Sequence, residues 1–374
     1  MLFRSVDFGP AARAAVPAVS KHLRAKSAIV REAAAAALAS IGPESRSATA
    51  DLARLLGDDS ALVRAAATAA LAAIGPDARD ASRALAGALA DADAMVRGGA
   101  ARALASIGPD AAGATGAIVS ALASETDGDV VVGLLDACGE IGPGAVQAAP
   151  ALVAALASKD AETREAAVSA LGELGPQAAA TAGGAVETLL DDADAFVRVA
   201  AVGALAGLGR QAPRARAILL EALGSDDEDL QASAAEVAGD RGKAPAGLAA
   251  ALSKVAGAAK DPHTRAAAIT ALGDIGAADQ AAALGKALDD DDADVRHAAA
   301  WAIADLPDAA AGLAKEIVAA ADDDDVRVRM EIAPLLAAIG SPDALTALKA
   351  LASDDDENVA AVAKAALEGP RASR

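Results

Sequence analysis

The sequence predicts an all-α solenoid of about eleven two-helix repeats, and three observations lead to this prediction. A stretch whose clearest copy is residues 60–76 recurs eleven times, at intervals of 31 to 34 residues, which is typical of a repeat array. Each copy has the apolar spacing of an amphipathic helix. A second helical spacing lies between successive copies. Because such a chain grows by stacking, we expect its 374 residues to form one array rather than several globular domains.

The recurring stretch is predicted to form an α-helix, here called the B helix. With Val63 as position zero, apolar residues fall at 0, +3, +4, +7, +8 and +11, on one helical face (Val63, Ala66, Ala67, Ala70, Leu71, Ile74). The residues at position zero are Val30, Val63, Val96, Val130, Thr163, Val197, Leu230, Thr264, Val295, Val328 and Val359.

Each B helix also carries its own start and stop signals. Position −3 is always Ser or Asp, whose side chain can accept a hydrogen bond from the first free backbone N–H groups. These residues are Ser27, Ser60, Asp93, Asp127, Asp160, Asp194, Asp227, Asp261, Asp292, Asp325 and Asp356. Position +12 is a glycine suited to ending a helix at positive φ. These glycines are Gly42, Gly75, Gly108, Gly142, Gly175, Gly209, Gly242, Gly276 and Gly340.

The second pattern, here the A helix, is illustrated by Ala81, Ala84, Leu85, Ala88 and Leu89, and ends near residue 91. Two helices in so short a period leave TPR, ankyrin, armadillo and HEAT repeats as candidates. The consensus motifs of TPR and ankyrin repeats are absent, and a third helix does not fit.

The remaining B-helix signature, Asp-x-x-Val-Arg-x-x-Ala-Ala-x-Ala-Leu-x-x-Ile-Gly, resembles the HEAT repeat, specifically its short phycobilisome-lyase-like variety. The resemblance implies a right-handed α-solenoid in which the Asp and the Arg form a hydrogen-bonded ladder between adjacent repeats. The implied ladder residues are Asp93, Asp160, Asp194, Asp261, Asp292 and Asp325 with Arg31, Arg64, Arg97, Arg164, Arg198, Arg265, Arg296 and Arg329. Val131, Gln231 and Ala360 replace the Arg, so the ladder should be broken at repeats four, seven and eleven.

The pattern predicts one solenoid over residues 11–368. Repeats one to six occupy 11–209, and repeat seven (210–243) is degenerate because Ala238 and Arg241 replace apolar stripe residues; repeats eight to eleven occupy 244–368. Residues 1–10 resemble the tail of a preceding repeat, so we expect the sequence to be a fragment, and 369–374 to be a frayed C-terminus.

Charge and composition narrow the function. The net charge of −20 argues against nucleic acid and against anionic membrane surfaces, and favours a basic protein or peptide partner. No apolar run long enough to span a membrane and no signal peptide is expected. The compartment stays unassigned, with the cytoplasm as default, because a signal upstream of Met1 would lie outside this sequence.

Catalytic chemistry finds little support in the sequence. Only His22, His263 and His297 occur, and no two share a helix face at metal-ligand spacing. The chain has no glycine-rich phosphate loop and no nucleophile elbow. We therefore expect no cofactor, no metal and no enzymatic activity of its own. The alternative is an enzyme-associated module, either bilin-lyase-like or the regulatory part of a larger enzyme.

The B-helix face that the apolar stripe leaves uncovered (+2, +6, +9, +10) lines the concave groove in HEAT-like arrays. Its occupants are mostly small, except for a discontinuous row of acids at +10: Glu140, Glu173, Asp240, Asp274 and Asp305. Each lies near a helix C-terminus, where negative charge is unfavourable unless a cation offsets it. These acids are either a binding surface for a basic partner or ordinary solvent-facing residues.

Trp301 at +6 is the only tryptophan, and His297 lies one turn earlier on the same face. An exposed Trp rimmed by acids is typical of a binding hot spot. Alternatively, it fills a gap where repeats nine and ten meet. We interpret the whole as a non-catalytic scaffold or adaptor that binds a basic protein or peptide along an acidic groove.

Overall fold

The computed structural model describes residues 9–212, 214–240 and 247–368, and all regular elements within these ranges are α- or 3₁₀-helices. The chain forms two compact units, Met1–Ala212 and Pro213–Arg374. The boundary lies close to the start of the predicted repeat seven. The single solenoid and its degenerate repeat remain predictions, since Arg241 and Gly242 lie outside the described residues.

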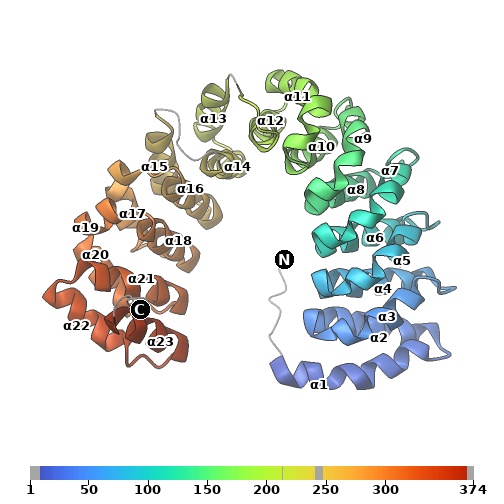
Figure 1. Cartoon of the computed structure of the whole chain (residues 1–374), viewed down its shortest axis with the longest axis horizontal. Helices are drawn as coiled ribbons and strands as arrows, with labels where there is room; N and C mark the ends of the chain where they lie inside the picture. The colour runs from blue at the N-terminus through green and yellow to red at the C-terminus, as the bar shows by residue number, and fades with distance from the viewer. Residues whose placement is uncertain (1–8, 213, 241–246, 369–374) are drawn as a thin grey trace, which may run out of the picture. The chain divides into compact units, whose positions relative to one another are not determined.

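In the first unit, B helices form one layer and A helices the other (Figure 1). The B helices are α2 (Ala28–Ile41), α4 (Ala61–Ile74), α6 (Ala94–Ile107), α8 (Gly128–Ile141), α10 (Ala161–Glu173) and α12 (Ala195–Gly207). The A layer consists of α1 (Gly9–Ser20), α3 (Thr49–Leu55), α5 (Ser82–Ala88), α7 (Thr115–Leu122), α9 (Ala149–Ala155) and α11 (Ala179–Thr188). Short 3₁₀ helices run with this layer: η1 (Lys21–Arg24), η2 (Gly42–Ala48), η3 (Gly75–Ala81), η4 (Gly108–Ala114), η5 (Gly142–Ala148), η6 (Pro176–Ala178) and η7 (Leu189–Asp191).

The second unit repeats the two-layer arrangement. Its B helices are α14 (Glu228–Gly239), α16 (Pro262–Asp274), α18 (Ala293–Ala304), α21 (Val326–Ile339) and α23 (Glu357–Glu368). The A layer contains α13 (Ala215–Leu223), α15 (Leu248–Ala258), α17 (Ala281–Ala287), α19 (Pro307–Gly312), α20 (Ala314–Ala319) and α22 (Pro342–Leu351), with η8 (Ala278–Gln280) and η9 (Ala320–Asp322). The two units therefore supply the eleven predicted B helices.

The core is the predicted stripe. Val63, Ala67, Leu71 and Ile74 are at most 1% exposed, and the other B helices bury most of the equivalent residues, with Val30 of α2 and Leu367 of α23 as exposed exceptions. The glycines that end the B helices at +12 have φ between 62° and 78° where they are described, as predicted. Gly242 lies outside the described residues.

The Ser and Asp residues at −3 do not cap their helices equally. All nine Asp residues accept hydrogen bonds from backbone N–H groups of the first turn. Ser27 and Ser60 make no such bond, so the prediction of a capping side chain is wrong at these two positions.

The predicted ladder exists, but its acid is not the capping residue. Seven of the eight predicted ladder arginines bind a carboxylate two residues before the next cap, with Nε–O distances of 2.6 to 2.9 Å. The pairs are Arg31–Asp58, Arg64–Asp91, Arg97–Glu125, Arg164–Asp192, Arg265–Asp290, Arg296–Asp323 and Arg329–Asp354. The predicted acids Asp93, Asp160, Asp194, Asp261, Asp292 and Asp325 are instead the N-caps.

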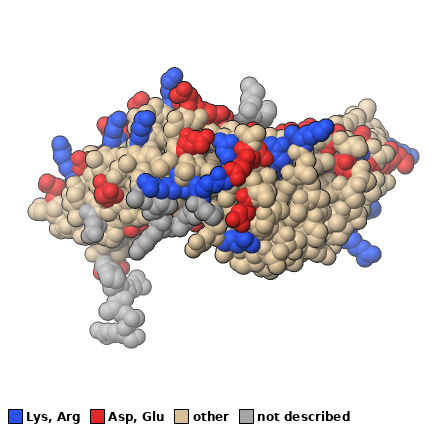
Figure 2. Space-filling view, turned by 90° about the horizontal axis from the view of Figure 1, so that it is seen from above, with Lys and Arg blue, Asp and Glu red and all other residues tan. Residues whose placement is uncertain are grey.

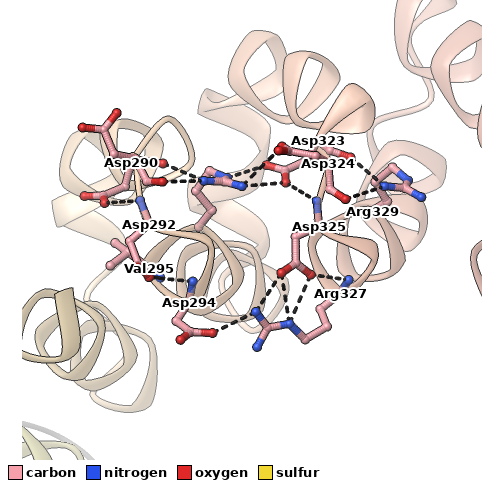
Figure 3. Close-up of polar contacts among 11 residues, drawn as sticks. Asp290, Asp292, Asp294, Val295, Asp323, Asp324, Asp325, Arg327 and Arg329 are labelled. Atoms are coloured by element: carbon pink, nitrogen blue, oxygen red, sulfur yellow. Dashed lines mark hydrogen bonds and ion pairs between the residues drawn. The ribbon is translucent and has the colours of Figure 1, made fainter. Parts of the chain in front are cut away.

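Each ladder arginine ties two turns together. Arg329 binds Asp354 of the following turn. Its Nη1 also donates to the carbonyl of Asp323 in its own turn, at 2.7 Å (Figure 3). The carboxylate of Asp323 in turn accepts from the backbone N–H of the cap Asp325 at 2.8 Å. One guanidinium thus bonds a carboxylate of the following turn and carbonyls of its own turn, which links consecutive repeats by charge-assisted hydrogen bonds.

Where the arginine is missing, the ladder changes as predicted at repeats four and seven. Val131 is followed by Ser158 in place of the acid, and the Oγ of Ser158 accepts a hydrogen bond from the backbone N–H of Asp160 at 3.2 Å. At repeat seven, the carboxylate of Glu228 instead accepts from the backbone N–H groups of Lys260 and Asp261, at 2.9 and 2.7 Å. Arg198 donates to the carbonyls of Asp192 and Ala193.

The charged groups of the turns largely occur as neighbours of opposite sign. Figure 2 shows clusters of acidic and basic side chains side by side on one face, with broad uncharged areas between them. Many acidic side chains of the turns thus lie beside an arginine or lysine, while other acids in the described part of the chain have no cationic neighbour.

One expectation about membranes needs correction. Within the described residues, the helical stretch Ala61–Ala88 is long and apolar enough to cross a membrane by length and composition. It comprises α4, η3 and α5 of repeat two, and 39% of its most apolar 18-residue segment is buried inside the protein. Because the core helix of a soluble protein passes the same test, this stretch is weak evidence for a membrane span.

Consecutive B helices approach closely at glycines in position +9. A Cβ placed on Gly172 of α10 would lie 2.7 Å from the Cα of Ala204 in α12, and one on Gly273 of α16 would lie 2.9 Å from the Cα of Ala302. Both close contacts are with main-chain atoms of the next helix, which cannot turn aside as a flexible side chain would.

We therefore expect Gly172→Ala to lower the free energy of unfolding by about 1–3 kcal/mol through overpacking. The matched control is Gly184→Ala in α11, where a Cβ meets nothing within 4 Å. This substitution should stabilise the protein by up to about 1 kcal/mol, because Ala favours helix over Gly. Urea unfolding followed by circular dichroism measures both. Stabilisation by Gly172→Ala would show that the helices can separate freely.

Candidate functional site

The uncovered face of the B helices is hollowed in both units. In the first unit, a cavity of about 690 Å³ lies over α4, α6 and α8. Its floor consists largely of Ala and Gly residues at +2, +6 and +9, with Arg102 and Asp136 at +6. The side chains of Met95, Asp129 and Glu162, all at position −1, lie along its border. This is the face that the sequence predicts as the groove.

In the second unit, a smaller hollow of about 320 Å³ lies between α14 and α16. Its lining includes Glu236, Asp240, His263 and Asp274, together with small residues of both helices. Two of the predicted +10 acids, Asp240 and Asp274, therefore share one hollow. His263 Nε2 lies 3.9 Å from a carboxylate oxygen of Glu236.

Asp274 is the best-defined acid of this hollow. A Cβ on Gly239 would lie 2.8 Å from its Oδ2, so the carboxylate leans across the C-terminal end of α14. Burial raises the pKa of Asp274, and the negative charges of Asp240 and Asp305 raise it further. Among the described residues, none of these three acids has a hydrogen bond or ion pair through its carboxylate. They form a negative site without a compensating cation.

The first-unit members of the predicted row are less enclosed. Glu140 and Glu173 are exposed, and Glu173 Cγ would lie 3.9 Å from a Cβ on Gly139. Glu140 is also one of the charges that raise the pKa of Asp136, after the larger effect of burial. Because the row is divided between the two units, its continuity remains a prediction.

Sequence reasoning missed three acids of the first unit, Asp136, Glu162 and Glu165. Burial raises the pKa of Glu165, and Asp194 and Glu162 raise it further. Asp136 and Glu165 occupy +6 and +2, so extending the survey from +10 to every uncovered position would have found them. In the structure Glu165 is half-buried, whereas Asp136 and Glu162 are exposed.

The structure places Trp301 beside Asp274, on α18 facing α16. The residue is half-buried, and its Cζ3 would lie 3.6 Å from a Cβ on Gly273. The ring thus lies close to repeat eight, and the alternative that it fills a gap between repeats nine and ten remains a prediction. His297 is also half-buried, and its charge helps to lower the pKa of Asp325, after the larger effect of hydrogen bonds from Arg327.

Other reactive groups give no site. Across the residues the structure describes, no group of three or more His, Cys, Asp or Glu side chains is arranged to hold a metal ion. Cys138 is fully buried, and burial raises the pKa of its thiol to about 12, so it behaves as a small apolar residue. The hollows near Met95 and His263 contain no aromatic side chain.

Comparison with known proteins bears on the fold. Residues 221–304 and 281–368 match the sequence model of the family described as HEAT repeats. No curated protein matches the sequence. Two crystal structures of engineered proteins are similar, one at 27% identity (TM-score 0.44, 52% of this chain, 96% of the other) and one at 23% (TM-score 0.45, 94% and 98%).

Kap121p bound to Pho4p is similar at 13% identity, with a TM-score of 0.50, over 94% of this chain and 45% of that chain. At this identity the likeness concerns the fold alone. This chain spans less than half the length of Kap121p.

Proposed function

We propose that this chain, of which residues 221–304 and 281–368 match the HEAT-repeat family model, is a non-catalytic scaffold whose B-helix face binds a basic segment of a partner protein or a basic peptide. The partner's Lys or Arg side chains would lie on Asp240, Asp274 and Asp305 of the second unit. Glu140 and Glu173 would play the same part in the first unit.

The observation that carries this proposal is the negative charge left uncompensated around Asp274. Asp274 is the last residue of α16, and Asp240 and Asp305 are the C-caps of α14 and α18. The carbonyl ends of helices disfavour negative charge. Burial and the neighbouring carboxylates add to this cost, as the raised pKa of Asp274 indicates. A cation bound from outside would offset all three effects.

Trp301 supplies the apolar part of the proposed surface. Its half-buried ring lies against the helix that ends in Asp274, so one partner segment can contact both. Aromatic side chains in this setting often dominate binding energy, while nearby charges mainly speed association. The partner segment should therefore combine basic residues with an apolar anchor.

A protein partner is compatible with this fold, since Kap121p, whose fold is similar, has been crystallised with the protein Pho4p.

Two alternative functions, an enzyme-associated role and nucleic-acid binding, have less support. For an enzyme-associated or bilin-lyase-like role, the two hollows offer no aromatic surface on which a tetrapyrrole could stack. Nucleic acid fits poorly with 53 acidic against 33 basic residues.

The proposal predicts how a fluorescein-labelled, lysine-rich peptide carrying one leucine will bind the full chain. Trp301→Ala should weaken binding about 30-fold, which corresponds to about 2 kcal/mol. Asp274→Asn with Asp305→Asn should weaken it about 10-fold, slow association and reduce its salt dependence. Fluorescence anisotropy and stopped-flow mixing measure these effects.

The control is Asp343→Asn with Asp355→Asn, which changes the net charge equally at exposed sites outside the B-helix face. This pair should change affinity less than about 2-fold. If it weakens binding as much as the groove pair does, the peptide is held only by the overall negative charge of the chain, and the proposed site is wrong.

A further inference from the structure

A row of large apolar side chains is exposed along the first unit. Position −1 of repeats one, two and three is occupied by Ile29, Leu62 and Met95, whose exposed fractions are 77%, 53% and 59%. These residues lie on α2, α4 and α6, which are consecutive B helices. Leu62 and Met95 each have a described repeat on both sides, so their exposure does not depend on the start of the chain.

The row is not a requirement of the repeat. In repeats four and five the same position holds Asp129 and Glu162, and repeat six holds the half-buried Phe196. In the second unit the position is polar throughout: Asp229, His263, Asp294, Arg327 and Asn358. A fold that tolerates Asp, Glu or Asn here gains no stability from an exposed Leu or Met. The apolar residues of repeats two and three therefore need another explanation.

The row leads into the hollow of the first unit. Met95 borders that hollow of about 690 Å³, and so do Asp129 and Glu162 at the equivalent position of the next two repeats. Leu62 occupies the equivalent position one repeat before Met95, outside the lining of the hollow. Position −1 of repeats two to five, here called the border, is thus apolar, apolar, acidic and acidic: Leu62, Met95, Asp129 and Glu162. Asp136, on the same helix as Asp129, also lines this hollow.

The acids of this border lack a cationic partner within the described part of the chain. Arg102 is the one basic residue lining the hollow, and it makes no hydrogen bond or ion pair with Asp129, Asp136 or Glu162. Burial raises the pKa of Asp136, and Glu140 and Glu162 raise it further. The apolar half of the border is uncovered and its acidic half is uncompensated.

We infer that this border is a second docking surface, and that its occupant is an extended segment of a partner protein with two apolar side chains followed by two basic ones. The inference rests on the proposed scaffold function and extends it to the first unit, with a partner chemistry of its own. Leu62 and Met95 would cover the apolar side chains, while Asp129 and Glu162 would bind the basic ones.

The geometry fixes the spacing of such a segment. Packed helices lie about 8–10 Å apart, and an extended chain advances about 3.3 Å per residue. Side chains three residues apart therefore meet successive B helices. The matching order is Leu-x-x-Leu-x-x-Lys-x-x-Lys, or its reverse, with small polar residues at x.

The test uses three labelled peptides of identical composition: this order, its reverse, and the alternating order Leu-x-x-Lys-x-x-Leu-x-x-Lys. Fluorescence anisotropy with the full chain should show one of the two block-ordered peptides binding at least 10-fold more tightly than the alternating one. Leu62→Ser with Met95→Ser should remove this preference. Asp129→Asn with Glu162→Gln should weaken binding and reduce its salt dependence.

Val146→Ser with Leu345→Ser removes exposed apolar side chains elsewhere and should leave the preference unchanged. Equal binding of all three peptides, or binding too weak to detect, overturns the inference. The inference is also overturned if the preference is lost only in the variant Asp274→Asn with Asp305→Asn. The peptides would then bind the acids of the second unit, and the function proposed for that unit would stand. Sedimentation that shows a dimer broken by Leu62→Ser with Met95→Ser would assign the row to a second copy of the chain instead.

Discussion

Replacing Arg296 with alanine should lower the free energy of unfolding by about 2–3 kcal/mol. The guanidinium forms two bonds to Asp323, at 2.7 and 3.0 Å, and also donates to the carbonyls of Asp290 and Asp291. Its side chain is only 13% exposed and that of Asp323 only 6%. Removing one partner of a fully buried pair costs about 3–5 kcal/mol, and we expect somewhat less because water still reaches this pair.

The comparison variants separate the ladder from surface charge. Arg79→Ala removes a pair with Asp110 at 3.7 Å whose side chains are 68% and 58% exposed, and should cost less than about 1 kcal/mol. Arg296→Lys keeps the charge but loses the fork, so it should recover only a small part of the loss. Urea unfolding of the three variants measures this order. Equal stability of Arg296→Ala and Arg79→Ala would show that the ladder does not hold the repeats together.

Acid should unfold the protein in a defined pH window. Hydrogen bonds from the ladder arginines lower the pKa of Asp58, Asp91, Asp192 and Asp354, and that of Glu125 to about 2. A group whose pKa is lower in the folded state stabilises the fold above its unfolded pKa. This stability is lost as the pH falls through the folded pKa, which for Glu125 means between about 4.5 and about 2.

Ionisation of the acids on the B-helix face has the opposite effect on the stability of the fold. Burial raises the pKa of Asp136, Glu165 and Asp274, so these groups weaken the folded state when ionised and cease to do so once protonated. We therefore expect the melting temperature to hold or rise slightly as the pH falls from neutral towards about 5. It should then drop steeply below about 4.5, where the ladder acids are protonated.

Thermal melts of the wild type and of Glu125→Gln at stepped pH values measure this effect. The variant should be less stable at neutral pH, and the difference should vanish by about pH 2, when the wild-type carboxylate is protonated too. Glu187→Gln, which changes an exposed pair with Arg210 at 3.3 Å, should follow the wild type throughout. A difference for Glu125→Gln that does not change with pH would show that its role is packing rather than charge.

The sequence was sufficient for the repeat because its signals are local. The apolar stripe, the Asp caps and the glycine at +12 act within one helix, and each was found where it was predicted. The ladder acid was assigned wrongly for a physical reason. Its turn contains several acids in succession, as in residues 322–325, and a spacing of two residues separates the cap from the acid that the arginine reaches.

The candidate sites depend on contacts between repeats, which the sequence does not show directly. The +10 acids could be listed in advance, but the raised pKa of Asp274 depends on burial between α14 and α16. The close approach of Trp301 to repeat eight depends on the absence of a side chain at Gly273. The apolar border of the first unit emerges only when exposure is compared at one position across all repeats.

Carboxylate footprinting tests the central claim most directly. The full chain is labelled with a carbodiimide and an amine, with and without the lysine-rich peptide that carries one leucine, and labelling is read residue by residue by mass spectrometry. The proposed surface predicts that the peptide protects Asp240, Asp274 and Asp305 and leaves Asp343 and Asp355 unchanged. Equal protection of both groups, or none at Asp274, would contradict the assignment of the B-helix face as the binding surface.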